Sequence, residues 1–190
     1  MKSFVHEPEG SPRAGMALFH GAGSNCESPL MVAVAAAFCA AGYLVLREDL
    51  PRGSAQRDRA AIRAAGERVR GLAPEVPLCL AGHSYGGRQC SMLAAEDPAV
   101  ADALLLLSYP LHPPRKPAEL RTGHFPQLRI PALFIHGTRD PFGSVAELEA
   151  AIETIPAQHV LIAMDGEGHG IKPKTAASLP QRLSAMMKLD

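Results

Sequence analysis

Residues 78–87 have the sequence Leu78-Cys79-Leu80-Ala81-Gly82-His83-Ser84-Tyr85-Gly86-Gly87, an apolar run that ends in a Gly-x-Ser-x-Gly pentad. The apolar run predicts a buried strand, and the residues after the pentad predict a helix. A serine at such a strand-to-helix corner is held in a sharp turn with its hydroxyl pushed out of the sheet, because only glycine fits beside it. Ser84 is therefore a candidate nucleophile, although the pentad alone also occurs by chance in loops.

Apolar strand-like runs alternate with segments of helical periodicity from about residue 16 onward. The predicted strands are residues 16–20, 43–47, 78–82, 103–109, 132–136 and 160–164. Such alternation is typical of a parallel sheet covered by helices. The best-marked helix is residues 29–41, with Ser28 before it and Gly42 after it. We expect one α/β domain over residues 1–190, in which residues 1–15 form an arm or one short edge strand.

The charge balance gives no sign of a polyanionic partner. The sequence has 19 basic and 19 acidic side chains, which does not favour nucleic acid or an anionic membrane surface. The arginines of residues 52–70 fall mostly on one predicted helix with acids among them, so we interpret them as a solvated helix face. We expect a small-molecule acyl substrate, and a monomer or a homodimer. Without a secretory signal pattern or a run long enough to cross a bilayer, the cytoplasm is the expected location.

No cofactor and no metal are predicted. The four cysteines form no Cys-x-x-Cys pair, so neither a disulfide framework nor a zinc site is indicated. Gly21-x-Gly23 after the first main strand is reminiscent of a dinucleotide site, but Cys26 stands at the third glycine position and the helix begins late. No phosphate-binding lysine motif or metal-ligand motif is present.

A serine hydroxyl needs a base within hydrogen-bond reach and an acid that orients this base. In a parallel sheet, the loops that follow the strands meet at one edge. Asp140 follows the fifth predicted strand, and His169 follows the sixth in a glycine-rich loop. Asp165 and Glu167 are rival acids near the same edge, and Asp140 is preferred. The sequence thus predicts Ser84, Asp140 and His169 as catalytic residues.

Acyl transfer also needs hydrogen-bond donors for the developing oxyanion. We expect these to be the backbone N–H groups of Tyr85, which follows the serine, and of Ala22, in the loop after the first main strand. The residues expected to line the substrate pocket are Gly21, Gly23, His83, Tyr109, Leu111 and His112. For the last three of these, a purely structural role as a rigid exit from the fourth predicted strand is an equal alternative.

With these residues, the sequence resembles the α/β-hydrolase superfamily from residue 17 to the carboxyl terminus. Residues 19–23, 108–114 and 130–137 are similar to the small hydrolase-like domain of testis-expressed protein 30 and NSL-complex subunit 3; dienelactone hydrolases are more distant relatives. The resemblance implies a three-layer fold: a mainly parallel, twisted sheet of about six strands with helices on both faces. It also implies Ser84 as nucleophile, His169 as base and Asp140 as acid. Residues 111–129 are too short for a separate lid domain, so we expect an open site.

These observations predict a metal-independent serine hydrolase that cleaves a small carboxylic ester, thioester or lactone through an acyl-enzyme on Ser84. The alternative is a non-catalytic binding or scaffold module on the same fold, which the resemblance to a chromatin-complex subunit allows. The retention of all three polar residues favours the enzyme.

Overall fold

The computed structural model describes residues 1–189, which contain one seven-stranded sheet. In spatial order, the strands are β1 (Ser3–His6), β3 (Tyr43–Glu48), β2 (Ala14–Phe19), β4 (Leu78–His83), β5 (Ala103–Leu107), β6 (Ala132–Gly137) and β7 (His159–Met164). Every neighbouring pair is parallel except β1 with β3, which is antiparallel. The mainly parallel sheet is confirmed, and all six predicted strands are present. Residues 3–6 form a short edge strand, which was one of the two predicted alternatives for residues 1–15.

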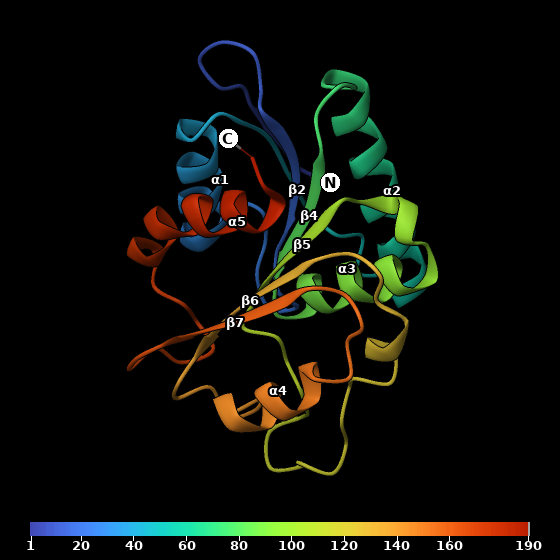
Figure 1. The fold of residues 1–190 in the computed structure, drawn as a ribbon, viewed down its shortest axis with the longest axis vertical. Helices are drawn as coiled ribbons and strands as arrows, with labels where there is room; N and C mark the ends of the chain where they lie inside the picture. Colours follow the sequence, from blue (N-terminus) through green and yellow to red (C-terminus); the bar gives the residue numbers. More distant parts are fainter. Residues whose placement is uncertain (190) are drawn as a thin grey trace.

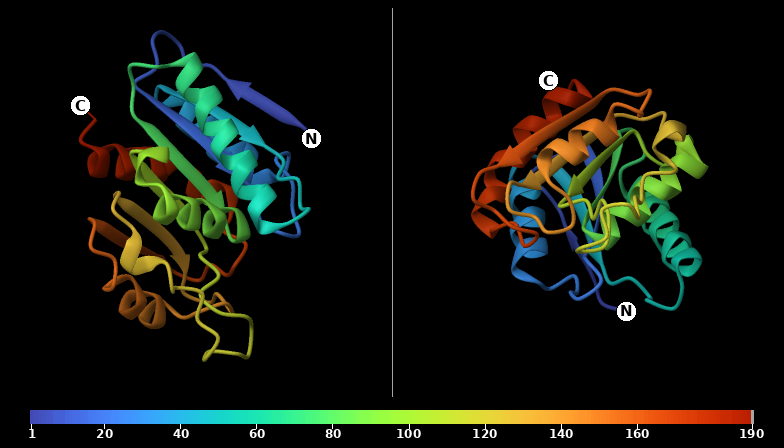
Figure 2. Two further views of the ribbon diagram at one scale, coloured as in Figure 1. Left: turned by 90° about the vertical axis from the view of Figure 1, so that its right-hand side faces the viewer. Right: turned by 90° about the horizontal axis from the view of Figure 1, so that it is seen from below.

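Within residues 1–189, five α-helices flank the sheet in two layers (Figure 1). They are α1 (Pro29–Ala40), α2 (Ala55–Leu72), α3 (Tyr85–Glu96), α4 (Val145–Ile152) and α5 (Leu179–Met187). Helices α1 and α5 pack on one face, and α2, α3 and α4 pack on the other. The turned views show the two layers on opposite sides of the twisted sheet (Figure 2). The alternation of strands and helices predicts a sheet covered by helices, and the resemblance implies a three-layer fold; both expectations are confirmed.

The core is divided in two by the sheet because successive side chains of a strand point to opposite faces. In β2, Met16 and Leu18 pack toward α1, whereas Ala17 and Phe19 pack toward α2 and α3. All six residues of β2 are buried, which is why its sequence is a continuous apolar run with no alternation. The central strands are therefore rigid supports for the loops at their carboxyl ends.

The connection between β5 and β6 is a loop without a lid domain, as its short length predicts. It contains a single 3-10 turn, η2 (Phe125–Gln127), and no separate lid within the part of the chain that the structure describes. Two further 3-10 turns, η1 (Pro98–Val100) and η3 (Pro173–Ser178), precede β5 and α5. The loops at the edge of the sheet are thus left without a covering domain.

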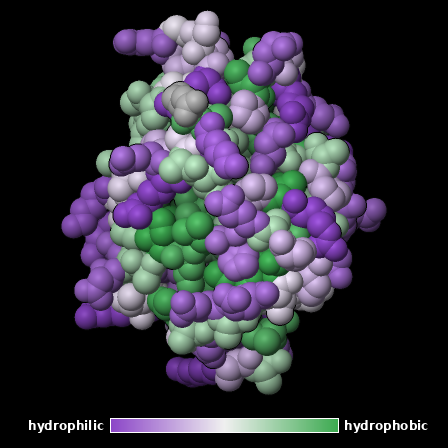
Figure 3. Space-filling model, in the orientation of Figure 1, coloured by the Kyte–Doolittle hydropathy of each residue, from purple (hydrophilic) through white to green (hydrophobic). Residues whose placement is uncertain are grey.

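The molecular surface carries polar helix faces and one partly apolar region. Four arginines of α2 form ion pairs with acids from neighbouring elements: Arg59 with Glu96, Arg63 with Asp97, Arg68 with Glu48 and Arg70 with Asp102. In Figure 3, apolar side chains gather near the middle of the viewed face, where β6 and β7 pass below α5. Across residues 1–189, none of the helices combines the length and the apolar character needed to cross a membrane.

Candidate active site

Ser84 lies at the sharp corner between β4 and α3, as the pentad predicts. Its backbone angles are φ 50° and ψ −115°, a left-handed conformation that costs a non-glycine residue about 1–3 kcal/mol. The turn is held because the N–H of Ser84 donates to the carbonyl of Leu107 at 2.8 Å, and its own carbonyl accepts from the N–H of Arg88 at 2.9 Å. Fixed from both sides, the serine hydroxyl points away from the sheet toward the loops that follow β6 and β7.

The glycines of the pentad are required by close approach of backbones. A Cβ atom at Gly82 would lie 2.4 Å from the backbone nitrogen of Gly87. A Cβ atom at Gly86 would lie 2.6 Å from the carbonyl oxygen of His20 at the end of β2. Because α3 therefore presses directly on the strand ends, its first turn is held against the loop that follows β2.

Gly86→Ala is expected to lower the free energy of unfolding by about 1–3 kcal/mol, the usual cost of overpacking, because neither backbone can retreat. Gly71→Ala is the matched control: nothing lies within 4 Å of its Cβ position, and alanine favours a helix over glycine. Urea unfolding of both variants measures the difference. If both variants were as stable as the unmodified chain, the close contact between α3 and β2 would be contradicted.

The structure brings Ser84, His169 and Asp140 into one hydrogen-bonded chain. His169 Nε2 lies 2.7 Å from Ser84 Oγ, and His169 Nδ1 lies 2.8 Å from Asp140 Oδ2. The Asp140 side chain is fully buried, and its other oxygen accepts the N–H of Phe142 at 2.9 Å. A buried carboxylate fixes the Nδ1–H tautomer of the imidazole, which leaves Nε2 free to accept the proton of the serine hydroxyl.

The two rival acids bind elsewhere. Glu167 is buried and accepts the N–H of Lys172 at 3.1 Å, with the ammonium of Lys172 at 3.4 Å. Asp165 is exposed and lies 3.5 Å from the hydroxyl of Thr138. Both carboxylates therefore shape the loop after β7, and Asp140 alone of the three contacts His169.

Two aromatic neighbours position the loop that carries His169. The ring of Phe142 lies 4.1 Å from the ring of His169, at an interplanar angle of 31°. His83 Nε2 donates to the backbone carbonyl of His169 at 2.8 Å, and burial lowers the pKa of His83 so that this ring stays neutral. His169 is thus held between a phenyl ring on one side and an imidazole donor behind its backbone.

A cleft of about 640 Å³ opens beside the serine hydroxyl. Its lining comprises Gly21, Ala22, Gly23, Ser24, His83, Ser84, Tyr85, Arg88, Pro110, Arg121, Phe142 and His169. The predicted pocket residues Gly21, Gly23 and His83 line this cleft, and so do both residues expected to donate backbone N–H groups, Ala22 and Tyr85. Because Tyr85 is the first residue of α3, its N–H has no partner within the helix.

The prediction that Tyr109, Leu111 and His112 line the pocket is wrong. Tyr109 and Leu111 are 1% and 0% exposed and pack into the core beneath α3 and α4, because the chain turns inward after β5. His112 is also buried, and its Nδ1 donates to the carbonyl of Pro113. These three residues instead form the rigid exit from β5, which was the structural alternative predicted for them.

Sequence reasoning missed three large side chains of the cleft: Arg88, Arg121 and Phe142. Arg88 follows Ser84 by four residues on α3, and that spacing on a helix was a usable signal. Phe142 lies two residues after Asp140 and could have been suspected from proximity alone. Arg121 lies in a loop without periodicity, so the sequence does not indicate in which direction its side chain points.

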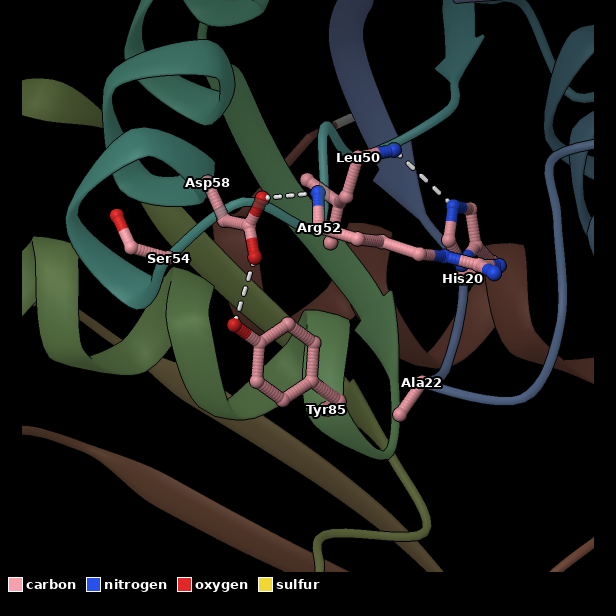
Figure 4. A pocket seen from close by; sticks show the side chains of 7 residues that line it. All are labelled: His20, Ala22, Leu50, Arg52, Ser54, Asp58 and Tyr85. Carbon is pink, nitrogen blue, oxygen red and sulfur yellow. Dashed lines mark hydrogen bonds between the residues drawn. The ribbon is translucent and has the colours of Figure 1, made fainter.

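A second, smaller pocket of about 200 Å³ adjoins the cleft at Ala22 and Tyr85, which line both (Figure 4). Inside it, the hydroxyl of Tyr85 donates to Asp58 at 2.7 Å, and the N–H of Arg52 donates to the other oxygen of Asp58 at 2.8 Å. Burial, with help from the Asp58 carboxylate, raises the pKa of Tyr85 to about 12. The first turn of α3 is thereby tied to the loop before α2.

His20 stabilises one wall of the smaller pocket. Its Nδ1 donates to the carbonyl of Gly21 at 2.7 Å, and its Nε2 accepts the N–H of Leu50 at 3.0 Å. Burial lowers the pKa of His20, so the ring is neutral. Within residues 1–189, no three His, Cys, Asp or Glu side chains gather where they could hold a metal ion.

A family model and several solved structures match this chain over nearly its whole length. Residues 12–188 match the family model described as "Alpha/beta hydrolase domain". Est1E from Butyrivibrio proteoclasticus superposes with a TM-score of 0.83 at 16% identity, over 99% of this chain and 94% of that one. Dienelactone hydrolase from Anabaena variabilis gives 0.78 at 22% identity, over 98% and 90%. A serine hydrolase without a lid from Xanthomonas campestris gives 0.73 at 20% identity, over 98% and 87%.

Proposed function

Because this chain belongs to the α/β-hydrolase family, we propose that it is a serine hydrolase that cleaves a small carboxylic ester, thioester or lactone through an acyl-enzyme on Ser84. The observation that carries the proposal is the hydrogen-bonded chain from Ser84 through His169 to Asp140, with distances of 2.7 and 2.8 Å. The narrower resemblance to testis-expressed protein 30 and NSL-complex subunit 3 stays a prediction.

The first half of the proposed reaction transfers the acyl group to the enzyme. Ser84 Oγ attacks the substrate carbonyl while His169 Nε2 takes its proton, and Asp140 stabilises the imidazolium that results. The backbone N–H groups of Ala22 and Tyr85 receive the oxyanion; loss of one such donor typically costs about 2.7–4 kcal/mol of barrier. His169 then gives the proton to the departing alcohol or thiol.

The second half returns the enzyme to its starting state. Water loses a proton to His169 as it attacks the acyl-enzyme, and Ser84 leaves with that proton, so the products are a carboxylic acid and the free hydroxyl. A lactone follows the same course, with its alcohol and acid in one product. The cleft of about 640 Å³ has room for a small acyl group and its leaving group, and similar structures include a complex of Est1E with ferulic acid and a dienelactone hydrolase.

The test is a panel of p-nitrophenyl esters of increasing acyl length, with and without prior treatment with a fluorophosphonate. We expect hydrolysis of the short esters, a decline for long chains, and complete loss after treatment. Folded protein that hydrolyses none of the esters and refuses the fluorophosphonate would overturn the proposal and favour a binding or scaffold module.

A further inference from the structure

Among residues 1–189, the lining of the cleft beside Ser84 includes two arginine side chains and no acidic residue. Arg88 lies on α3 one turn after Ser84, and Arg121 comes from the connection between β5 and β6. Both Ser84 and Arg88 line this cleft, so the first turn of α3 brings a positive charge to the side on which Ser84 opens. Two positive charges from separate segments therefore meet at the place where a substrate would bind.

Four arginines of α2 show the usual arrangement, in which a guanidinium group pairs with a carboxylate. On α2, Arg59 lies 3.2 Å from Glu96 and Arg70 lies 3.3 Å from Asp102, and two further arginines of that helix are paired in the same way. In residues 1–189, Arg88 and Arg121 make no such ion pair. Asp58, an acid beside Tyr85, is occupied by the hydroxyl of that tyrosine and by the N–H of Arg52.

The side chains packed around Arg88 are neutral. Ser91 Oγ donates to the backbone carbonyl of Arg88 and contacts His124 Nε2 at 2.8 Å. Burial, together with the charge of Arg88, lowers the pKa of His124 to about 4, so this imidazole is uncharged. Burial also raises the pKa of Tyr109, whose phenol is a neutral hydrogen-bonding neighbour of the Arg88 side chain. The buried Nε of Arg88 has no hydrogen-bond partner among the described residues.

Arg121 is held in place by its backbone, and its side chain is left free for a ligand. Its carbonyl accepts the hydroxyl of Tyr109 at 2.7 Å, and its N–H donates to Leu111 at 2.8 Å. Burial, followed by the charge of Arg88, lowers the pKa of Arg121, so the two guanidinium groups repel each other. Tyr109 and then Glu119 have smaller effects in the opposite direction on the pKa of Arg121, and the Glu119 carboxylate pairs with Lys116 at 2.8 Å. An anion between the two arginines would replace this repulsion with attraction.

We propose that the substrate of Ser84 carries a carboxylate group, which Arg88 and Arg121 bind while the scissile carbonyl lies at the serine. The inference rests on the proposed hydrolase function and narrows its substrate to anionic esters, thioesters or lactones. A planar guanidinium donates two parallel hydrogen bonds to a carboxylate, so two of them can neutralise and orient the group. A neutral ester would leave both cations desolvated without an anionic partner, and the cleft therefore selects against it.

Two matched pairs of esters test the proposal. The first pair is mono-p-nitrophenyl adipate and its methyl-capped diester, which places the charge on the acyl side. The second is para-acetoxybenzoate and its methyl ester, which places the charge on the leaving group. In at least one pair, the anionic member is expected to have a kcat/KM about 10- to 100-fold higher, the range that charge-assisted hydrogen bonds produce.

Substitution of the arginines identifies the source of the preference. In Arg121→Gln and in Arg88→Gln, the anionic-to-neutral ratio of kcat/KM is expected to fall about tenfold or more. Arg182→Gln on α5 removes an exposed positive charge far from the cleft and should leave the ratio unchanged. Should Arg88→Gln fail to fold, Arg121→Gln decides, since no described hydrogen bond of the Arg121 side chain would be lost.

A binding measurement separates failure of this inference from failure of the proposed function. Calorimetry with Ser84→Ala is expected to show adipate binding that weakens when Arg121→Gln is added. Such binding would support the carboxylate site even if no ester were hydrolysed. Ser84-dependent hydrolysis with equal rates in both pairs would overturn the inference and keep the proposed function. Binding of inorganic phosphate but not of adipate, or of neither, would also overturn it.

Discussion

Ser84→Ala is expected to reduce kcat for a short p-nitrophenyl ester on the order of 10⁵- to 10⁶-fold, the loss typical of a serine nucleophile. Alanine keeps the backbone turn but removes the oxygen that lies 2.7 Å from His169 Nε2. Without it, no acyl-enzyme forms, and residual activity can come only from water that the rest of the site activates. Stopped assays with an active-site fluorophosphonate should show no labelling of the variant.

Ser108→Ala is the matched control for this prediction. Ser108 also has a left-handed backbone, with φ 48°, and its buried hydroxyl has no hydrogen-bond partner in the described chain. Because this hydroxyl is away from the cleft lining, its removal should leave kcat and labelling intact. If Ser84→Ala retained most of its activity while unfolding at the same temperature as the unmodified chain, Ser84 would not be the nucleophile.

The fold could be predicted from the sequence because its signals are local and repeated. Central strands such as β4 and β5 are buried on both faces and therefore read as unbroken apolar runs, and parallel strands bring their carboxyl ends to one edge. That rule, together with the pentad around Ser84, placed Ser84, Asp140 and His169 in the same region, where they are found within hydrogen-bond distance. Strand β1 is half-exposed and only four residues long, and it left no pattern strong enough to choose between a strand and an arm.

The walls of the cleft could not be predicted in the same way. Position after a strand indicates which edge a residue occupies but not which way its side chain turns. Tyr109 follows β5 as Asp140 follows β6, yet its ring turns into the core against Phe125 and Phe134. Arg121 reaches the cleft because its carbonyl accepts the hydroxyl of Tyr109 and its N–H donates to the carbonyl of Leu111, and these bonds fold its loop back over the site. Such contacts are set by tertiary packing, which periodicity does not encode.

Asp140→Asn is expected to lower kcat about 10⁴-fold, as the equivalent change does in serine proteases, with little loss of stability. One oxygen of Asp140 accepts the N–H of Phe142 at 2.9 Å, and the other accepts from His169 Nδ1. An asparagine must keep its carbonyl oxygen toward Phe142, so its NH₂ group would face Nδ1. The imidazole would then carry its proton on Nε2, where it donates to Ser84 and cannot act as the base.

Asp165→Asn and Glu167→Gln separate this effect from a general loss of negative charge at the same edge. Asp165 is exposed, and Asp165→Asn should change kcat by less than about twofold, since surface substitutions away from a site are usually near neutral. Glu167 accepts the N–H of Lys172 and pairs with its ammonium group. Glu167→Gln should therefore lower the unfolding temperature and have little effect on kcat. Only loss of the carboxylate that fixes the His169 tautomer should produce the largest fall in kcat. If Asp165→Asn or Glu167→Gln lowered kcat more than Asp140→Asn does, that residue would be the orienting acid instead of Asp140.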